Sequence, residues 1–169
     1  MKNKALFLDR DGTINVDTGY TYRIDDFRFT DGIVDLCRAA QENGYKIIVA
    51  TNQSGIARGY YTENDFHVLT AHMNALFQKE GVTVTDVFFC PFLNGEDRKP
   101  NPGMFFKARD KYALDMASCV GVGDKERDVE AGLNAGVGRN FLWSDTAVSS
   151  KATAVVKSLK EVIPFLIAG

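Results

Sequence analysis

Short runs of apolar residues alternate along the chain with longer amphipathic segments, a pattern typical of α/β proteins with a parallel sheet. Residues 5–8 are all apolar, as in strands that are buried on both faces. Further strands are predicted at residues 46–50, 84–90, 118–122 and 141–143. Helices are predicted over residues 31–43, from a capping box at 62–65 to Gly81, from 101–102 onward, after Gly123-Asp124 as far as Gly136, and after a capping box at 158–161.

Length and composition narrow the class of protein. The 169 residues suffice for one domain with a full core, and 45% hydrophobic with 25% charged residues is ordinary globular composition. The net charge is −2 and no stripe of Lys and Arg is present, so we expect a small-molecule partner, no nucleic acid and no membrane. We also expect a monomer, because the patterning shows no long unpaired apolar surface.

The chain has three scattered cysteines and a polar N-terminal start. Cys37, Cys90 and Cys119 are odd in number, which favours reduced thiols in a cytoplasm over a disulfide framework. The apolar run at 5–8 is far too short for a secretory signal. The predicted location is therefore cytoplasmic.

Polar residues follow several of the predicted strands. Because ligand sites in parallel sheets lie beyond the carboxyl ends of the strands, these residues are expected at one edge of the sheet. Taken singly, each Asp or Thr is equally well explained as a helix cap. Four strand ends that all carry acidic, basic or hydroxyl side chains are better explained together, as parts of one reaction centre. The residues concerned are Asp9, Asp11, Thr51, Arg98, Lys99, Asp124 and Asp128.

This set predicts phosphoryl transfer through an aspartyl phosphate. Asp9 would attack phosphorus, and Asp11 would give a proton to the departing alkoxide and later take one from water. Asp9 and Asp124 would bind Mg²⁺, a hard ion that prefers oxygen ligands. Lys99 would supply a fixed cation and Thr51 a hydroxyl donor.

Four ordered motifs carry a family resemblance that spans almost the whole chain. The motifs are Asp9-Arg-Asp-Gly-Thr13, Thr51-Asn52, Lys99-Pro100, and Gly121-Val-Gly-Asp124 with Asp128. With these motifs the chain resembles the haloacid dehalogenase superfamily of phosphatases, and within it the D-glycero-D-manno-heptose-1,7-bisphosphate 7-phosphatases, with the histidinol-phosphate phosphatases as close relatives. The resemblance implies a Rossmann-like three-layer α/β/α sandwich with a mostly parallel central sheet.

The resemblance also implies roles for individual residues. Asp9 would be the nucleophile and Asp11 the acid and base, with Asp9, Asp124 and the Asp11 backbone carbonyl as Mg²⁺ ligands. Further residues would contact the substrate. Thr51, Asn52 and Lys99 are implied at the transferring phosphate, Arg98 and Lys125 are implied toward the rest of the substrate, and Gln53 and Arg58 are further candidates for substrate binding.

The spacing between motifs leaves no room for a cap domain. One loop and one helix fit between Asp11 and Thr51, and one helix and one strand fit between Thr51 and Lys99. We therefore predict a single capless domain over residues 1–169, in which the loops at 17–22 and 54–61 select the substrate.

Two further residues, one in the loop at 54–61 and one directly after Asp11, have a predicted task. Arg58 would pair with a distal phosphate, although a solvated loop arginine is the alternative. Gly12 would let the backbone approach the phosphate without a β-carbon in the way.

A departure from the relatives concerns zinc. Relatives often carry a zinc-binding loop with several cysteines before the Arg-Lys-Pro element, whereas residues 90–100 of this chain keep only Cys90. A closed zinc site takes four Cys or His ligands. His67 and His72 lie five residues apart, which is not the spacing of a helical metal pair. We expect no structural zinc.

Several alternatives remain open at the level of sequence. A histidinol-phosphate phosphatase or a broader small-molecule phosphatase would use the same motifs. A silent phosphosugar-binding module is a non-enzymatic alternative, which the presence of both Asp9 and Asp11 disfavours. Asp128 could orient a metal-bound water, hold Lys99, or simply lie on the surface. Among these alternatives, the resemblance implies hydrolysis of the 7-phosphate of a heptose bisphosphate, a step in making nucleotide-activated heptose for lipopolysaccharide or a surface glycan.

Overall fold

A single parallel sheet forms the centre of the molecule. The computed structural model describes residues 2–167. Its six strands lie in the order β3-β2-β1-β4-β5-β6, and every neighbouring pair is parallel. The strands are β1 (Lys4–Leu8), β2 (Tyr45–Asn52), β3 (Val84–Cys90), β4 (Val120–Gly123), β5 (Arg139–Trp143) and β6 (Ala154–Val156). The predicted α/β fold with a parallel sheet is confirmed.

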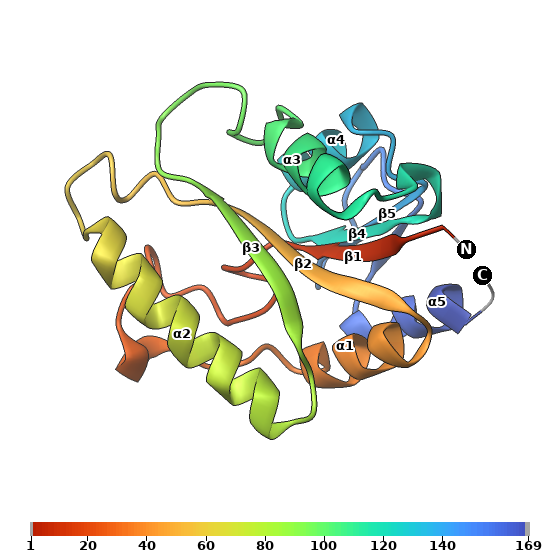
Figure 1. Cartoon of the computed structure of the whole chain (residues 1–169), viewed down its shortest axis with the longest axis horizontal. Helices are drawn as coiled ribbons and strands as arrows, with labels where there is room; N and C mark the ends of the chain where they lie inside the picture. The colour runs from red at the N-terminus through yellow and green to blue at the C-terminus, as the bar shows by residue number, and fades with distance from the viewer. Residues whose placement is uncertain (1, 168–169) are drawn as a thin grey trace.

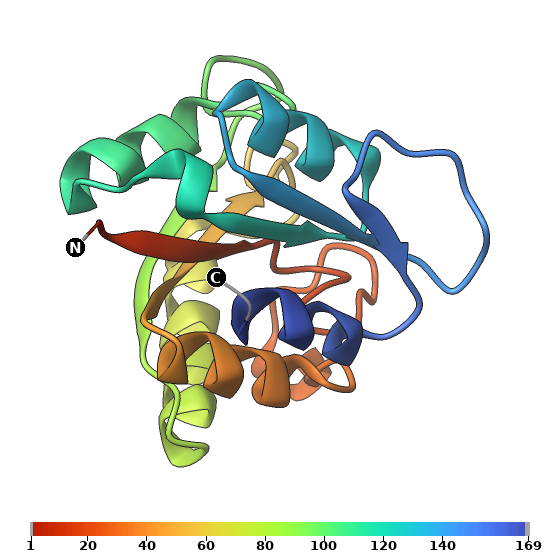
Figure 2. The ribbon, with the colours of Figure 1, turned by 90° about the vertical axis from the view of Figure 1, so that its right-hand side faces the viewer.

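Helices cover both faces of this sheet and make three layers. Figures 1 and 2 show α3 and α4 on one side of the sheet and α1, α2 and α5 on the other. The helices are α1 (Ile33–Glu42), α2 (Glu63–Lys79), α3 (Gly103–Tyr112), α4 (Glu126–Asn134) and α5 (Ile163–Ile167). Three short 3-10 helices, η1 (Ile24–Asp26), η2 (Met116–Ser118) and η3 (Leu159–Val162), join them.

The two faces of β1 explain its unbroken apolar sequence. Leu6 and Leu8 belong to the core beneath α1, α2 and α5, whereas Ala5 and Phe7 belong to the core beneath α3 and α4. Successive side chains of a strand point to opposite faces, so a strand between two cores needs apolar residues at every position. β1 therefore forms the centre of the molecule.

Local signals placed some helix ends correctly and others not. Thr62 and Asp65 form the predicted capping box of α2, and Ser158 caps η3, which leads into α5. Asn101 was wrongly predicted to cap α3. That helix begins at Gly103 after Pro102, because the Asn101 side chain instead donates a hydrogen bond to the carbonyl of Gly95.

Two differences concern the strands. The predicted strand at 118–122 begins later, because residues up to Ser118 form η2 and the strand runs from Val120. The sixth strand, β6, was not predicted. It has only three residues, too few for a recognisable pattern, and forms by pairing with β5.

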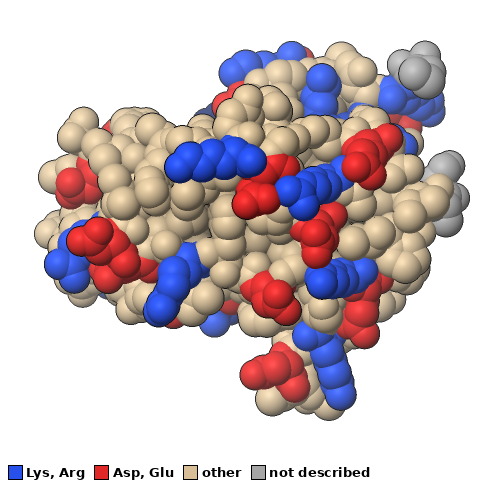
Figure 3. Space-filling model, turned by 90° about the horizontal axis from the view of Figure 1, so that it is seen from below, with Lys and Arg blue, Asp and Glu red and all other residues tan. Residues whose placement is uncertain are grey.

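The surface of the described residues carries mixed charge. On the face seen in Figure 3, Lys and Arg side chains are interspersed with Asp and Glu side chains. Among residues 2–167, no helix combines the length and apolarity required to cross a membrane.

Candidate active site

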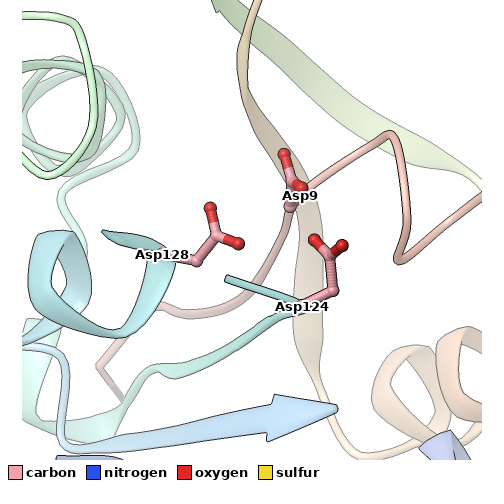
Figure 4. A group of neighbouring side chains, drawn as sticks. All are labelled: Asp9, Asp124 and Asp128. Atoms are coloured by element: carbon pink, nitrogen blue, oxygen red, sulfur yellow. The ribbon is translucent and has the colours of Figure 1, made fainter. Parts of the chain in front are cut away.

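Three carboxylates meet at the carboxyl ends of the two central strands. Asp9 directly follows β1, Asp124 follows β4, and Asp128 lies in the first turn of α4. The backbone N–H of Asp9 donates a hydrogen bond to the carbonyl of Val122, which ties the end of β1 to β4. Figure 4 shows the three side chains pointing toward one another, and each offers a ligand atom within 4.8 Å of the others.

Lys99 lies buried beside this cluster. Its Nζ is 3.0 Å from Oδ1 of Asp9 and 2.7 Å from Oδ1 of Asp128, and it donates a hydrogen bond of 2.6 Å to the carbonyl of Ala50. Only 3% of Lys99 is exposed. Of the roles left open for Asp128, holding Lys99 is therefore confirmed, and a plain surface role is wrong.

The cluster carries more negative than positive charge. Burial and the charges of Asp9 and Asp128 raise the pKa of Asp124 to about 8. Burial and the charge of Asp9 also raise the pKa of Asp128. Burial alone would lower the pKa of Lys99, but the charges of Asp128 and Asp9 more than offset this and raise it. Three carboxylates thus face a single ammonium group.

The donor set fits a hard divalent cation. Oδ1 of Asp124 is buried without a hydrogen-bond partner among the described residues, although a carboxylate oxygen normally has one. Oxygen atoms of Asp9 and Asp124 match the preference of Mg²⁺ for one or two carboxylates. A cation between them would offset the excess negative charge.

Gly12 makes room for this arrangement. It has a φ of +90°, and a β-carbon at this position would overlap the carboxylate of Asp124. The sequence predicted that Gly12 allows close approach of a phosphate. The structure shows that the group lying against Gly12 is a carboxylate of the cluster.

Asp11 lies apart from the three clustered carboxylates. Its Oδ1 accepts hydrogen bonds from Nε of Arg10 and Nδ2 of Asn15, at 3.1 and 3.0 Å. Its Oδ2 accepts from Nη2 of Arg10 and Nε2 of Gln53, both at 3.1 Å. The side chain of Asp11 is therefore bound on both oxygens at the wall of the cleft.

The residues at the end of β2 line the cleft and also form hydrogen bonds with other residues of the site. The amide of Asn52 donates to the carbonyl of Lys99 and accepts from its backbone N–H, at 3.1 and 3.0 Å. Gln53 is buried and donates to Oγ1 of Thr51 at 2.9 Å. The predicted contacts of Thr51, Asn52 and Gln53 with substrate stay predictions; their present contacts hold Lys99 and Asp11 in place.

A polar cleft of about 340 Å³ opens beside the cluster. Most of the residues predicted to contact substrate line it, together with residues of the loops at 17–22 and 54–61; the exception is Lys99, which is buried beside Asp9. Arg58, Arg98, Lys125 and Arg127 face this cleft, and the structure gives none of these four an ion pair with a described carboxylate. Unpaired cations around a cleft attract anionic ligands.

Sequence reasoning missed Arg127 and Arg10. Arg127 lies in the first turn of α4, where an arginine is usually part of a solvated face, and only the fold brings it to the cleft. Arg10 stands between the two motif aspartates, but nothing in its neighbours indicates that its side chain is buried.

The three cysteines are buried free thiols. Burial raises the pKa of the Cys37 thiol, and it raises the pKa of Cys119 to about 11. Cys90 lies at the end of β3 with its Sγ near the carbonyl of Phe92. The prediction that no structural zinc is bound stays a prediction.

Comparison with known proteins gives consistent similarities. The family model described as "Polynucleotide kinase 3 phosphatase" matches residues 4–162. A protein of Burkholderia mallei named D-glycero-alpha-D-manno-heptose-1,7-bisphosphate 7-phosphatase is 47% identical, covering 98% of this chain and 95% of its own. A Campylobacter jejuni protein with the same name is 46% identical over 98% of this chain and 96% of its own.

Two further similar proteins are a relative named for the other anomer of the sugar and a relative with a solved crystal structure. A Helicobacter pylori protein named for the beta anomer is 41% identical, covering 97% of this chain and 98% of its own. The crystal structure of a D,D-heptose 1,7-bisphosphate phosphatase from B. bronchiseptica, complexed with magnesium and phosphate, superposes with a TM-score of 0.86 at 27% identity and covers 98% of both chains.

Proposed function

Because this chain belongs to the polynucleotide kinase 3 phosphatase family of the haloacid dehalogenase superfamily, we propose that it hydrolyses the 7-phosphate of D-glycero-D-manno-heptose 1,7-bisphosphate. It is a phosphatase, that is, a phosphoric monoester hydrolase. The proposal concerns its substrate, its cofactor and the roles of its residues. One observation carries it: four cations without an ion pair among the described residues line a cleft together with Asp9, a member of the carboxylate cluster that also contacts the buried Lys99.

The proposed reaction has two steps. An oxygen of Asp9 forms a bond to phosphorus while the bond from phosphorus to O7 of the sugar breaks, and Asp11 gives a proton to that oxygen. Water then forms a bond to phosphorus while the bond to Asp9 breaks, and Asp11 takes the proton from the water. Lys99 fixes Asp9 through a 3.0 Å contact, and Thr51 donates its hydroxyl to the phosphoryl group.

Asp9, Asp124 and the backbone carbonyl of Asp11 would hold Mg²⁺. When bound, the ion neutralises the nucleophile and the phosphoryl oxygens. Asp128 is less available as a ligand, because Lys99 and the backbone N–H of Lys125 already occupy its oxygens. Its proposed task is to hold the ammonium group of Lys99 in contact with Asp9.

The cations of the cleft would bind the phosphate that is not transferred. Arg58 and Arg98 can form bidentate contacts with phosphate, and Lys125 and Arg127 add charge from the start of α4. The same cations disfavour histidinol phosphate, whose far end carries a protonated amine. An anionic group at that end of the substrate gives the better electrostatic match.

The proposal extends to the setting of the enzyme. We place it in the cytoplasm as a monomer with one capless domain, so that the loops at 17–22 and 54–61 select the substrate. Its product would serve the synthesis of nucleotide-activated heptose for lipopolysaccharide or a surface glycan. The relatives are named for either anomer, so both anomers belong in the assay.

Specificity constants test the proposal. Purified protein with Mg²⁺ is assayed on both anomers of the heptose 1,7-bisphosphate, on the heptose 7-phosphate and on histidinol phosphate. We expect the bisphosphate to exceed the 7-phosphate in kcat/KM by about ten- to a hundredfold, since one charged hydrogen-bonded contact contributes about 1.5–3 kcal/mol. A preference for histidinol phosphate would refute the proposed substrate, and no phosphate release from any ester would favour a silent binding module.

A further inference from the structure

A completely buried arginine stands between the two motif aspartates. Arg10 is 1% exposed, the largest of the fully buried side chains. The backbone wraps around it, because its carbonyl accepts hydrogen bonds from the N–H groups of Thr13, Ile14 and Asn15. These bonds fix the backbone of Arg10 directly before Asp11, which lines the active-site cleft.

Asp11 is the one carboxylate, within the described part of the chain, that pairs with this guanidinium. Nε and Nη2 of Arg10 donate to the two oxygens of Asp11 at 3.1 Å each, a bidentate contact between two planar groups. Nη2 also donates to the carbonyl of Thr21 at 2.6 Å. The ring of Phe66 lies 5.4 Å from Cζ, so Arg10 is held on several sides.

Stability alone is a poor reason for this burial. A buried guanidinium loses its hydration, and buried ion pairs often add no net stability over apolar residues of similar size. Moreover, Nη1 of Arg10 is buried without a hydrogen-bond partner among residues 2–167. A costly and incompletely satisfied charge beside the proposed acid and base indicates a task in the reaction.

Gln53 and Tyr61 hold Asp11 from the other side. Nε2 of Gln53 donates to Oδ2 of Asp11, and Oε1 of Gln53 accepts a hydrogen bond from the hydroxyl of Tyr61. The ring of Tyr61 stacks on that of Tyr22 with the ring centroids 5.3 Å apart. The carboxylate of Asp11 is therefore held between the guanidinium group of Arg10 and the side-chain amide of Gln53, which is itself hydrogen-bonded to Tyr61.

We propose that Arg10 is a positioning residue for proton transfer: it fixes the direction in which Asp11 presents its oxygens to the leaving group and to the attacking water. Gln53, anchored by Tyr61, completes this support. The inference rests on the proposed function, because it requires Asp11 to transfer the proton. Arg10 does not touch the substrate, as its side chain is buried behind Asp11.

The choice of leaving group separates positioning from a general structural role. A sugar alkoxide needs a proton when it leaves, whereas p-nitrophenolate leaves without one. In Arg10→Lys the charge is kept, but one ammonium group cannot replace the two-pronged contact. Misdirected proton transfer should therefore slow cleavage of a sugar phosphate far more than cleavage of p-nitrophenyl phosphate.

The experiment measures the phosphorylation step in single turnovers with Mg²⁺. We expect Arg10→Lys to slow acid-quenched cleavage of the best sugar phosphate by about a hundredfold or more. The burst of p-nitrophenolate should stay within a factor of about five of the wild type. Burst kinetics are necessary because the later attack by water also uses Asp11 and would limit steady-state turnover of either substrate.

Two further variants complete the design. Tyr61→Phe removes one neutral hydrogen bond and should show the same contrast at about two- to tenfold, and it carries the test if Arg10→Lys does not fold. Arg23→Lys is the matched control, since Arg23 is exposed and pairs with Asp26 outside the cleft. Equal slowing of both substrates in the folded variants, or no slowing, overturns the role of Arg10. If the wild type cleaves neither substrate, the proposed function itself is wrong.

Discussion

Replacing Asp124 by asparagine should stabilise the metal-free protein while removing its response to Mg²⁺. Asp124 is packed against Asp9 and Asp128, with a single buried lysine as the counter-charge. The variant Asp124→Asn keeps the shape of the side chain and removes one negative charge. Its amide can donate a hydrogen bond to a neighbouring carboxylate, which Asp124 in its ionised form cannot.

The magnitude follows from the pKa of Asp124. Burial and the charges of Asp9 and Asp128 raise this pKa from 3.8 to about 8. At pH 7 the unfolded chain carries an ionised Asp124, so folding must bring a proton to it. The roughly three pH units between 3.8 and 7 correspond to a loss of folding free energy of about 4 kcal/mol, which is an upper bound. Because neighbouring groups adjust, we expect Asp124→Asn to raise the free energy of unfolding by about 2 to 4 kcal/mol.

The sign of the pH dependence is also fixed. A group whose pKa is higher in the folded than in the unfolded protein favours folding below its unfolded pKa. This contribution is lost as the pH rises through its folded pKa. The gain in stability of Asp124→Asn over the wild type should thus be small near pH 4, widen toward pH 8, and level off above it.

Thermal unfolding followed by circular dichroism measures this gain. In EDTA at pH 7, Asp124→Asn should melt about 4 to 16 °C above the wild type, given a shift of about 2 to 4 °C per kcal/mol at this size. Added Mg²⁺ should raise the melting temperature of the wild type but not that of the variant. Asp145→Asn, at an exposed position, is the control and should stay within about 0.5 kcal/mol of the wild type. A variant less stable than the wild type in EDTA, or a pH-independent difference, would refute the reasoning.

Three further predictions concern the nucleophile, the cleft and Gly12. Asp9→Asn should lower kcat by at least about 10³-fold while circular dichroism shows a folded protein, and retained turnover would exclude the aspartyl phosphate. Arg127→Gln should lower kcat/KM for the bisphosphate by about ten- to a hundredfold but leave the 7-phosphate nearly unchanged. Arg109→Gln, at an arginine that pairs with its neighbour on the surface, is its control, and equal effects on both substrates would count against a distal phosphate site. Gly12→Ala should weaken Mg²⁺ binding in calorimetric titration by at least about tenfold and cost about 1–3 kcal/mol of stability, because its β-carbon would displace Asp124; unchanged affinity would contradict this.

Patterns within short segments predicted most of the fold. The apolar run before Asp9, the capping box at Thr62 and the glycines at helix ends are all local signals, and the corresponding elements are present. Elements with weak local signals were misplaced or missed. Asn101 has the right residue type for a helix cap, but its side chain bonds to a distant carbonyl instead. The three residues of β6 form a strand only because β5 offers them partners.

By itself, the sequence determined that Asp9, Thr51, Lys99 and Asp124 converge, because in a parallel sheet with helical crossovers every strand delivers its carboxyl end to the same edge. Only the tertiary structure decided what each of these groups contacts. The hydrogen bond between the Asn52 side chain and the backbone of Lys99 joins residues that are 47 positions apart in the sequence. The contact of Lys99 with Asp9 joins residues that are 90 positions apart.

The burial of Arg10 and the arrival of Arg127 at the cleft likewise depend on how the loops and α4 pack against the sheet. The spacing of residues along the chain predicts which side chains share a strand end or a helix face. It does not report which partner each polar atom finds, because that depends on the competition among all the groups that folding brings within hydrogen-bond distance.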